Sequence, residues 1–189
     1  MAARRNPAST IYILRAELQD IEPLIWRRLH VLTNISLPKL HSALQVVMGW
    51  TDSHLHSFHI GDHVYSNTED LDDLNMLPEK GRNLGALLGD TIRDFGYEYD
   101  FGDGWKHRIT VESISKPVVD SPYPLCVAGE RACPPEDVGG VPGYEDFLKA
   151  ITDQKHEEHD SMLVWIGGTF DPEGFDINCV NRELRRLRL

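Results

Sequence analysis

Carboxylate and imidazole side chains gather around a predicted tight turn within residues 96–112. From Tyr97 to Phe101, aromatic residues alternate with acidic ones, which predicts a strand with one aromatic and one acidic face. Gly102 and Gly104 then favour a hairpin turn, because glycine permits positive backbone φ values. The residues that we expect to converge near this turn as a polar site are Asp100, Asp103 and His107.

Two members of this group also have purely structural interpretations. His107 lies between Trp105 and Ile109 on one face of the returning strand, and therefore in an apolar stripe. Buried polar groups are normally hydrogen-bonded to a neighbour for the sake of the fold. Asp100, in turn, would serve as the partner of a buried arginine. The sequence leaves these interpretations open beside the functional one.

The arginine in question comes from a predicted strand over residues 25–32. Arg27 and Arg28 fall on opposite faces of this strand, so one of them must lie near apolar neighbours. A buried guanidinium needs a carboxylate or carbonyl partner, because breaking a buried pair costs about 3–5 kcal/mol. We expect Glu98 or Asp100 of the hairpin to be that partner.

A second candidate region is the proline- and glycine-rich stretch 118–143. Its composition predicts an irregular loop with one fixed path, and loops held by a scaffold often carry function. Glu136 and Asp137 are its acidic residues nearest to the next predicted helix, which begins at Tyr144. They are candidate site residues. Alternatively, they cap that helix or pair with the two arginines of the strand over 25–32.

Cysteines and histidines are weak candidates for metal ligands. Cys126 and Cys133 are seven positions apart, which is wider than the spacing usual in structural zinc sites. His54 and His56 are two apart on one predicted strand face and could chelate an ion. Histidines that could complete a zinc site with the cysteines are His54, His56, His156 and His159. A divalent metal is therefore a possible cofactor, and no other cofactor follows from the sequence.

Composition argues against several function classes. The chain has 189 residues and a formal net charge of −11, so non-specific binding to the phosphate backbone of nucleic acid is disfavoured. It lacks an apolar run long enough to cross a membrane and a signal-like apolar stretch near the N-terminus. Three cysteines without an export signal favour reduced thiols and a cytoplasmic protein.

The order of predicted elements indicates an α+β fold. Adjacent strands come first and helices mostly later, which favours an antiparallel or mixed sheet with 96–112 as a central hairpin and helices packed mainly on one face. We expect residues 1–9 to be a flexible N-terminus and 10–189 to form a single domain. The partner would be an unknown protein or a small ligand.

Three stretches together resemble one family: IYILRAELQDIEPLIWRRLHV, YEYDFGDGWKHRITVE and, from Tyr123 to Leu148, YPLCVAGERACPPEDVGGVPGYEDFL. They are similar to the plasmid pRiA4b ORF-3-like family, whose members are also labelled as passenger proteins of transposable elements. The resemblance spans roughly Thr10 to the C-terminus and implies a mobile-element association but no established activity. Pro134 to Gly140 matches the family pattern position by position. The resolvase label of some members implies a nucleophilic serine amid arginines and a basic tail, and neither is recognisable here.

Three functional hypotheses follow. The preferred one is a non-enzymatic binding or accessory domain with a cleft between the 96–112 hairpin and the 123–143 loop. Another is nucleic-acid binding through Arg27, Arg28 and the C-terminal arginines, which requires salt-sensitive affinity. The third is a metal-dependent hydrolase or nuclease, which separate ion pairs with the arginines would contradict. Its candidate residues are His54, His56, Asp100, Asp103, His107, Glu136 and Asp137.

Overall fold

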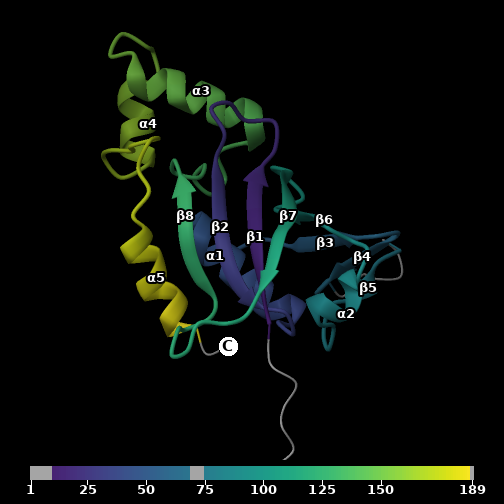
Figure 1. The fold of residues 1–189 in the computed structure, drawn as a ribbon. Helices are drawn as coiled ribbons and strands as arrows, with labels where there is room; N and C mark the ends of the chain where they lie inside the picture. Colours follow the sequence, from purple (N-terminus) through teal and green to yellow (C-terminus); the bar gives the residue numbers. More distant parts are fainter. Residues whose placement is uncertain (1–9, 69–74, 188–189) are drawn as a thin grey trace, which may run out of the picture.

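The computed structural model describes residues 10–68 and 75–187, and its strands form one mixed sheet (Figure 1). The predicted flexible N-terminus, 1–9, lies outside the described residues. The strand order is β5-β4-β3-β6-β7-β1-β2-β8. The strands are β1 (Ile11–Leu18), β2 (Trp26–Leu32), β3 (His56–Ile60), β4 (His63–Ser66), β5 (Leu77–Pro78), β6 (Asp94–Tyr99), β7 (Trp105–Ser115) and β8 (Leu125–Glu130).

Neighbouring strands are antiparallel except for the short parallel pair of β4 and β5. The predicted hairpin is formed by β6 and β7, with Tyr97 opposite His107 and Tyr99 opposite Trp105. β7 then pairs with β1, so the hairpin connects the two halves of the sheet. The mixed sheet and its helices confirm the α+β prediction.

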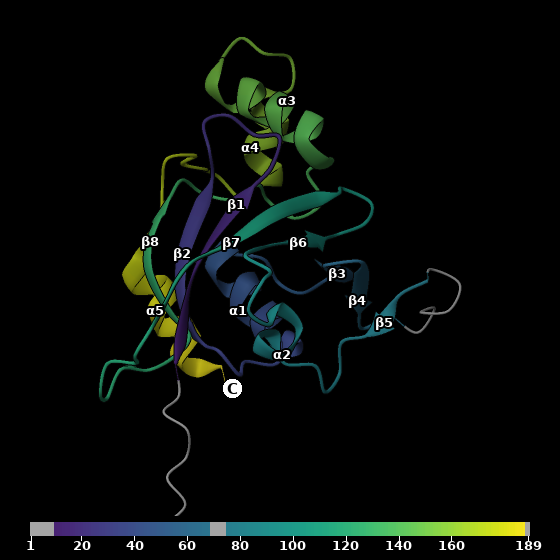
Figure 2. The same ribbon diagram turned by 45° about the vertical axis from the view of Figure 1, so that its right-hand side comes forward.

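Five helices accompany the sheet in the described part of the chain. Figures 1 and 2 show α1 against the sheet, α5 beside β8, and α3 with α4 at one end of the molecule. Among the described residues, no helix is both long and apolar enough to cross a membrane. The helices are α1 (Leu37–Met48), α2 (Leu84–Leu88), α3 (Gly140–Thr152), α4 (His159–Trp165) and α5 (Ile177–Arg186).

The core lies between α1 and the sheet face that it covers. α1 begins after Ser36, with proline in its first turn, and ends at Met48. The C-cap is Gly49, whose φ of +91° is easily adopted by glycine. The helix contributes buried apolar side chains at helical spacing. Fully or almost fully buried members of this core are Leu14, Leu18, Leu29, Val31, Leu37, Leu40, Leu44, Val47, Tyr97, Tyr99, Ile109 and Val111.

The hairpin turn differs from the predicted one. β6 ends at Tyr99, and Asp100 already has a positive φ of 56°. The strand therefore stops two residues earlier than expected, and Phe101 lies in the turn with 37% of its surface exposed. Because aspartate tolerates the left-handed conformation better than most residues, the chain can reverse at this position.

The proline-rich stretch also differs from the prediction. It is not irregular throughout, because β8 lies within it and pairs with β2 at the edge of the sheet. The following helix begins at Gly140 rather than at Tyr144, and Gly139 is its N-cap without a side-chain cap. Glu136 and Asp137 therefore do not cap α3.

Arg27 is the buried arginine, but its partners are not the expected carboxylates of the hairpin. The side chain is 1% exposed and its guanidinium stacks on Phe175, with Cζ 4.0 Å from the ring centroid. Arg28, in contrast, is partly exposed and forms a two-contact ion pair with Glu112 (2.6 and 2.8 Å). The carbonyl oxygens that accept hydrogen bonds of 2.7–2.8 Å from Arg27 are those of Trp26, Val47, Glu130 and Arg131.

Replacing Arg27 by lysine should destabilise the protein strongly. An ammonium has three donors and no planar fork, so buried carbonyls would lose partners. We expect Arg27→Lys to lower the free energy of unfolding by about 3 kcal/mol in urea titrations. The matched Arg28→Lys change should cost less than about 1 kcal/mol, because exposed ion pairs contribute little. Equal effects of the two changes would contradict this role of Arg27.

Candidate functional site

Asp100 presents one carboxylate oxygen to the junction between the hairpin turn and the proline-rich loop. Its Oδ1 accepts hydrogen bonds from the backbone amides of Gly102 (2.9 Å) and Asp103 (3.3 Å). These bonds fix the side chain, which is 9% exposed. The other oxygen, Oδ2, lies 3.7 Å from Nε2 of His54. Asp100 therefore serves the turn with one oxygen and faces an imidazole with the other.

Asp137 reaches the same imidazole from the PPEDVGG segment. Its Oδ1 lies 3.0 Å from Nε2 of His54, and its φ is +58°. The segment is tied to the hairpin because the amide of Gly139 donates to Oδ2 of Asp103 (3.1 Å). The backbones also touch, since a Cβ on Gly140 would lie 2.6 Å from the carbonyl oxygen of Asp103. This close approach requires glycine at that position.

His54 supplies the nitrogen that both carboxylates approach. It lies just before β3, and its ring meets the ring of Tyr99 in a T-shaped contact with centroids 6.0 Å apart. Nε2 is a buried atom that makes no geometrically acceptable hydrogen bond within the described ranges, despite its short distance to Asp137. One ligand atom each from His54, Asp100 and Asp137 lies within 4.8 Å of the other two.

The two distances from Nε2 of His54, 3.7 Å to Asp100 and 3.0 Å to Asp137, suit ligands of one divalent cation. Ligand atoms about 2.1 Å from an ion lie roughly 3 to 4 Å from one another. One imidazole nitrogen with two carboxylate oxygens is a donor set that suits Zn²⁺ or Mn²⁺. Three protein ligands leave further coordination positions for water or for a bound molecule. We name His54, Asp100 and Asp137 the junction site.

Glu136 holds the loop in place rather than facing the junction site. Its carboxylate accepts hydrogen bonds from the amide of Thr51 (2.7 Å) and from the hydroxyl of Tyr99 (3.0 Å). Burial raises the pKa of Tyr99, so its hydroxyl keeps the proton that it donates. A further tie comes from Trp50, whose Nε1 donates to the carbonyl of Pro134 (3.0 Å).

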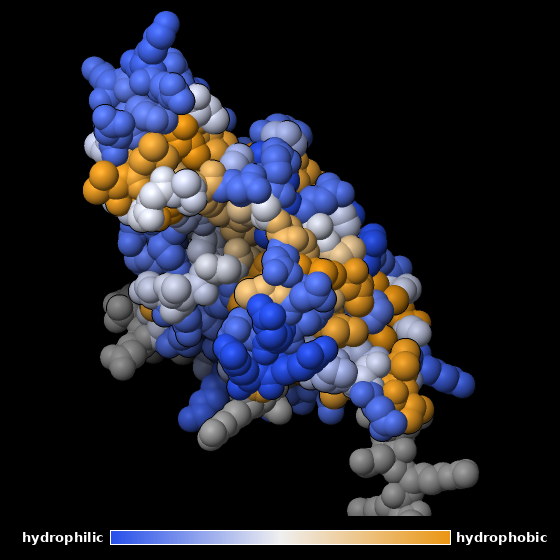
Figure 3. Space-filling view, turned by 90° about the vertical axis from the view of Figure 1, so that its left-hand side faces the viewer, coloured by the Kyte–Doolittle hydropathy of each residue, from blue (hydrophilic) through white to orange (hydrophobic). Residues whose placement is uncertain are grey.

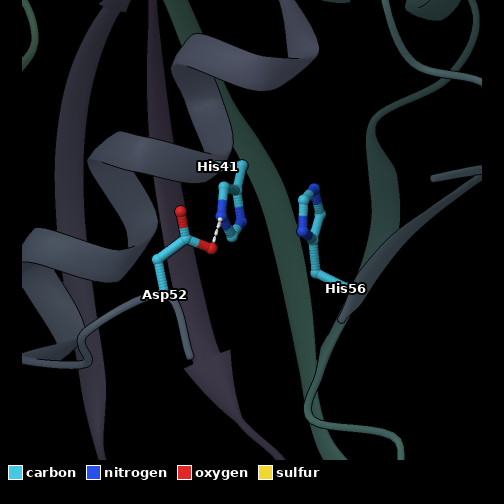
Figure 4. Close-up of side chains that lie close together, drawn as sticks. All are labelled: His41, Asp52 and His56. Carbon is cyan, nitrogen blue, oxygen red and sulfur yellow. Dashed lines mark hydrogen bonds and ion pairs between the residues drawn. The ribbon is translucent and has the colours of Figure 1, made fainter. Parts of the chain in front are cut away.

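His56 belongs to a second cluster, which Figure 4 shows with His41 and Asp52. The rings of His41 and His56 are stacked, with centroids 3.5 Å apart and planes 8° apart. Nitrogen lone pairs lie in the ring plane, so two parallel rings cannot direct them at one ion without rotating. His56 Nε2 also pairs with Glu79 (3.0 Å). This arrangement is less suited to a cation than the junction site.

A closed circuit of hydrogen bonds explains this second cluster. Gln45 Nε2 donates to the hydroxyl of Tyr97 (3.0 Å), which leaves the hydroxyl proton for His41 Nδ1 (2.9 Å). His41 Nε2 then donates to Asp52 (2.8 Å), whose amide donates back to Gln45 Oε1 (2.8 Å). The circuit fixes the tautomer of His41 and joins α1 to the sheet, which is a structural role.

His107 is a core residue. It is 1% exposed, and its Nδ1 lies 3.2 Å from the carbonyl of Tyr97 and 3.1 Å from that of Trp105. Two carbonyl neighbours require Nδ1 to carry the proton, so Nε2 holds the lone pair, and it finds no partner among the described residues. Burial lowers the pKa of His107 to about 4. The imidazole is therefore neutral at physiological pH.

The cysteines are placed away from the histidines that could have joined them. Cys133 Sγ lies 3.6 Å from Nη2 of Arg27 and 3.2 Å from Sδ of Met48. Burial raises the pKa of Cys126 and of Cys133 to about 11, so both remain thiols. In the part of the chain that the structure describes, no cluster of metal-ligating groups includes a cysteine.

The structure thus brings together only some of the candidate residues. Asp100 and Asp137 meet at His54. Asp103 and Glu136 hold the loop in place by accepting hydrogen bonds from Gly139 and from Thr51 and Tyr99. His56, His107 and the two arginines lie in separate structural networks. His54 is a candidate metal ligand in the sequence analysis. The sequence does not show, however, that a left-handed turn at Asp100 directs the carboxylate of Asp100 toward His54.

The low pKa of His107 makes stability depend on pH. The folded state holds this imidazole neutral, whereas the unfolded chain takes up a proton below about pH 6.5. Stability is therefore complete above that pH and falls as the pH drops toward 4, by on the order of 3 kcal/mol. Burial also lowers the pKa of His41, which acts in the same direction.

Replacing His107 by asparagine tests this assignment. The amide nitrogen of asparagine can replace Nδ1 as a donor, but it does not titrate. Urea titrations between pH 4 and 7 should show that His107→Asn removes about one proton from the pH dependence of unfolding. An unchanged slope would show that His107 is not the titrating group.

Comparisons with known proteins agree with the resemblance seen in the sequence. Residues 10–179 match the model of the family described as plasmid pRiA4b ORF-3-like protein. The uncharacterized protein y4hQ of Sinorhizobium fredii is 35% identical over 181 residues, which cover 95% of this chain and 93% of the relative.

A solved structure is also similar along almost its whole length. The crystal structure of the protein of unknown function MM3350 from Methanosarcina mazei Go1 superposes with a TM-score of 0.84 at 36% identity. The match covers 91% of this chain and 98% of that one. The chain thus belongs to the plasmid pRiA4b ORF-3-like family.

Proposed function

We propose that this protein is a binding domain that holds a divalent cation where the 96–112 hairpin meets the 123–143 loop. The ligands are His54, Asp100 and Asp137. The observation that carries the proposal is the convergence of one imidazole nitrogen and two carboxylate oxygens within 4.8 Å, from three separate segments of the chain. The convergence joins the two stretches that the sequence singles out.

Rigidity of the ligands supports this proposal. Asp100 is held by two amides of its own turn, and Asp137 follows Glu136, which is held by Thr51 and Tyr99. Both aspartates have positive φ values, of 56° and 58°. Unusual backbone conformations that the surrounding structure maintains are common at functional sites. A cation would therefore find its ligands already in place.

Access from solvent supports a binding role for the site. The side chain of Asp137 is 72% exposed, whereas Nε2 of His54 and the side chain of Asp100 are buried, so solvent would reach the ion from the side of Asp137. Two apolar neighbours of the ligands are exposed: Leu55, which follows His54, is 45% exposed, and Phe101, which follows Asp100, is 37% exposed. A protein or small ligand with an oxygen donor would complete the coordination and contact these apolar side chains.

The cellular context is part of the proposal. The plasmid-derived description of the family supports an association with mobile elements. The three cysteines are free, which supports a reducing, cytoplasmic location. The one continuous sheet supports a single domain over residues 10–189.

A metal-dependent hydrolase is the second candidate function. It is favoured because three protein ligands leave a position for water, as in catalytic zinc sites, where the ion activates that water as a nucleophile. This candidate requires that manganese or zinc stimulate hydrolysis of a simple ester or phosphodiester, and that Asp100→Asn abolish the activity. We do not propose nucleic-acid binding, because Arg27 is buried and Arg28 is paired with Glu112.

Calorimetric titration of the chelator-treated protein with MnCl₂ and with ZnCl₂ tests the cation site. We expect the wild-type protein to bind one ion. Asp100→Asn and His54→Gln should each lower the affinity for the ion at least about tenfold relative to the wild-type protein. Asparagine tolerates a positive φ and keeps Oδ1 as an acceptor for the turn amides, so Asp100→Asn should leave the fold intact. Saturating metal should also raise the melting temperature of the wild-type protein.

The matched control is His59→Gln, at an exposed position of β3. This variant should bind metal like the wild-type protein. If the wild-type protein binds no ion stoichiometrically, or if His41→Gln weakens binding while His54→Gln does not, the junction site is not the cation site.

A further inference from the structure

A groove with an apolar floor opens between the PPEDVGG loop, α3 and α4. Its volume is about 420 Å³, within the range of pockets that take a ligand or a few side chains. Figure 3, which faces the side of α4 and α5, shows hydrophobic residues gathered above a strongly hydrophilic surface. The apolar residues that line the groove are Val138, Phe147, Met162 and Trp165.

α4 leaves two of its apolar side chains exposed. None of its seven residues is buried, and Val164 and Trp165 are 81% and 47% exposed. The ring of Trp165 meets Phe147 edge to face, with centroids 5.6 Å apart, so the tryptophan is positioned rather than loose. Clustered exposed apolar side chains mark interaction sites more often than single ones do.

The rim of the groove is acidic. It includes Asp137, Asp146 and Glu158, all of which are exposed. Residues 145–160 contain six acidic residues and two lysines, and the whole chain carries a net charge of −11. One rim residue, Asp146, forms an exposed ion pair with Lys149, which is weak and easily exchanged. The rim therefore favours a partner with positive charge.

We propose that this groove docks a short basic and apolar segment of a partner protein. One or two large apolar side chains would pack on Met162 and Trp165, above the buried Phe147. Lysine or arginine residues would face Asp137 and Glu158. Nucleic acids and anionic membranes are repelled by the same rim. The alternative occupant is a second copy of this chain, whose α5 carries Arg182, Arg185 and Arg186.

Docking does not require the cation. Asp137 is shared between the groove rim and the junction site, but the apolar floor comes from α3, α4 and Val138. Experiments in excess EDTA therefore test docking alone. In EDTA, Asp100→Asn should bind a partner as the wild-type protein does, so failure of the cation proposal and failure of the docking proposal can be told apart.

The test is fluorescence anisotropy with labelled peptides of about 14 residues, a length at which a peptide can form several helical turns. The probe peptide is composed of leucine and lysine residues. One comparison peptide replaces leucine by serine, and another replaces lysine by glutamate. At physiological salt, the leucine–lysine peptide should bind at least about tenfold more tightly than either comparison peptide. Equal binding of the serine–lysine peptide or of the leucine–glutamate peptide would overturn the proposal.

Matched variants locate the binding. Trp165→Ser and Glu158→Gln should each weaken binding of the leucine–lysine peptide about fivefold or more. Their controls are Val119→Ser, at an apolar position 84% exposed elsewhere, and Glu157→Gln, beside the rim. If the control variants weaken peptide binding as much as the groove variants do, the proposal is overturned. Sedimentation equilibrium will show whether the protein forms a dimer. A dimer that dissociates in the Trp165→Ser variant would identify a second copy of the chain as the occupant of the groove, and would also overturn the proposal.

Discussion

The buried guanidinium of Arg27 is the interaction on which the rest of the structure depends. Its donors reach the end of α1 at Val47, its own strand, and the end of β8 at Glu130 and Arg131. A charge in the core is tolerated because carbonyl dipoles replace its water and Phe175 covers one face. Since the PPEDVGG segment begins a few residues later, Arg27 also helps to set the path by which Asp137 reaches His54.

Polar residues in this protein divide into those that complete one another and those that do not. His41, Gln45, Tyr97 and Asp52 satisfy one another in a closed circuit, and Glu136 is saturated by Thr51 and Tyr99. At the junction site, in contrast, two carboxylates approach one imidazole nitrogen without forming a hydrogen bond to it. The convergence of two carboxylates on one nitrogen distinguishes this site, because an unpaired nitrogen alone also occurs in the core, at Nε2 of His107.

Much of the fold could be predicted from the sequence, because periodicity reports burial directly. The strand over residues 25–32 and the hairpin within residues 96–112 follow from local patterns, and they correspond to β2 and to β6 with β7. The site was only partly predictable. Asp100 and Asp137 were candidates, but the left-handed turn that orients Asp100 and the meeting of both with His54 depend on tertiary contacts. Likewise, the spacing of residues in the sequence cannot show that Arg27 donates to backbone carbonyls rather than to carboxylates.

Anomalous diffraction at the manganese absorption edge, from crystals soaked in MnCl₂, would show whether the junction site binds a cation. We expect one strong peak between His54 Nε2, Asp100 Oδ2 and Asp137 Oδ1, about 2.1 to 2.3 Å from each ligand atom. A peak beside His41 and Asp52 instead, or no peak at the junction of hairpin and loop at full soaking concentration, would contradict this expectation.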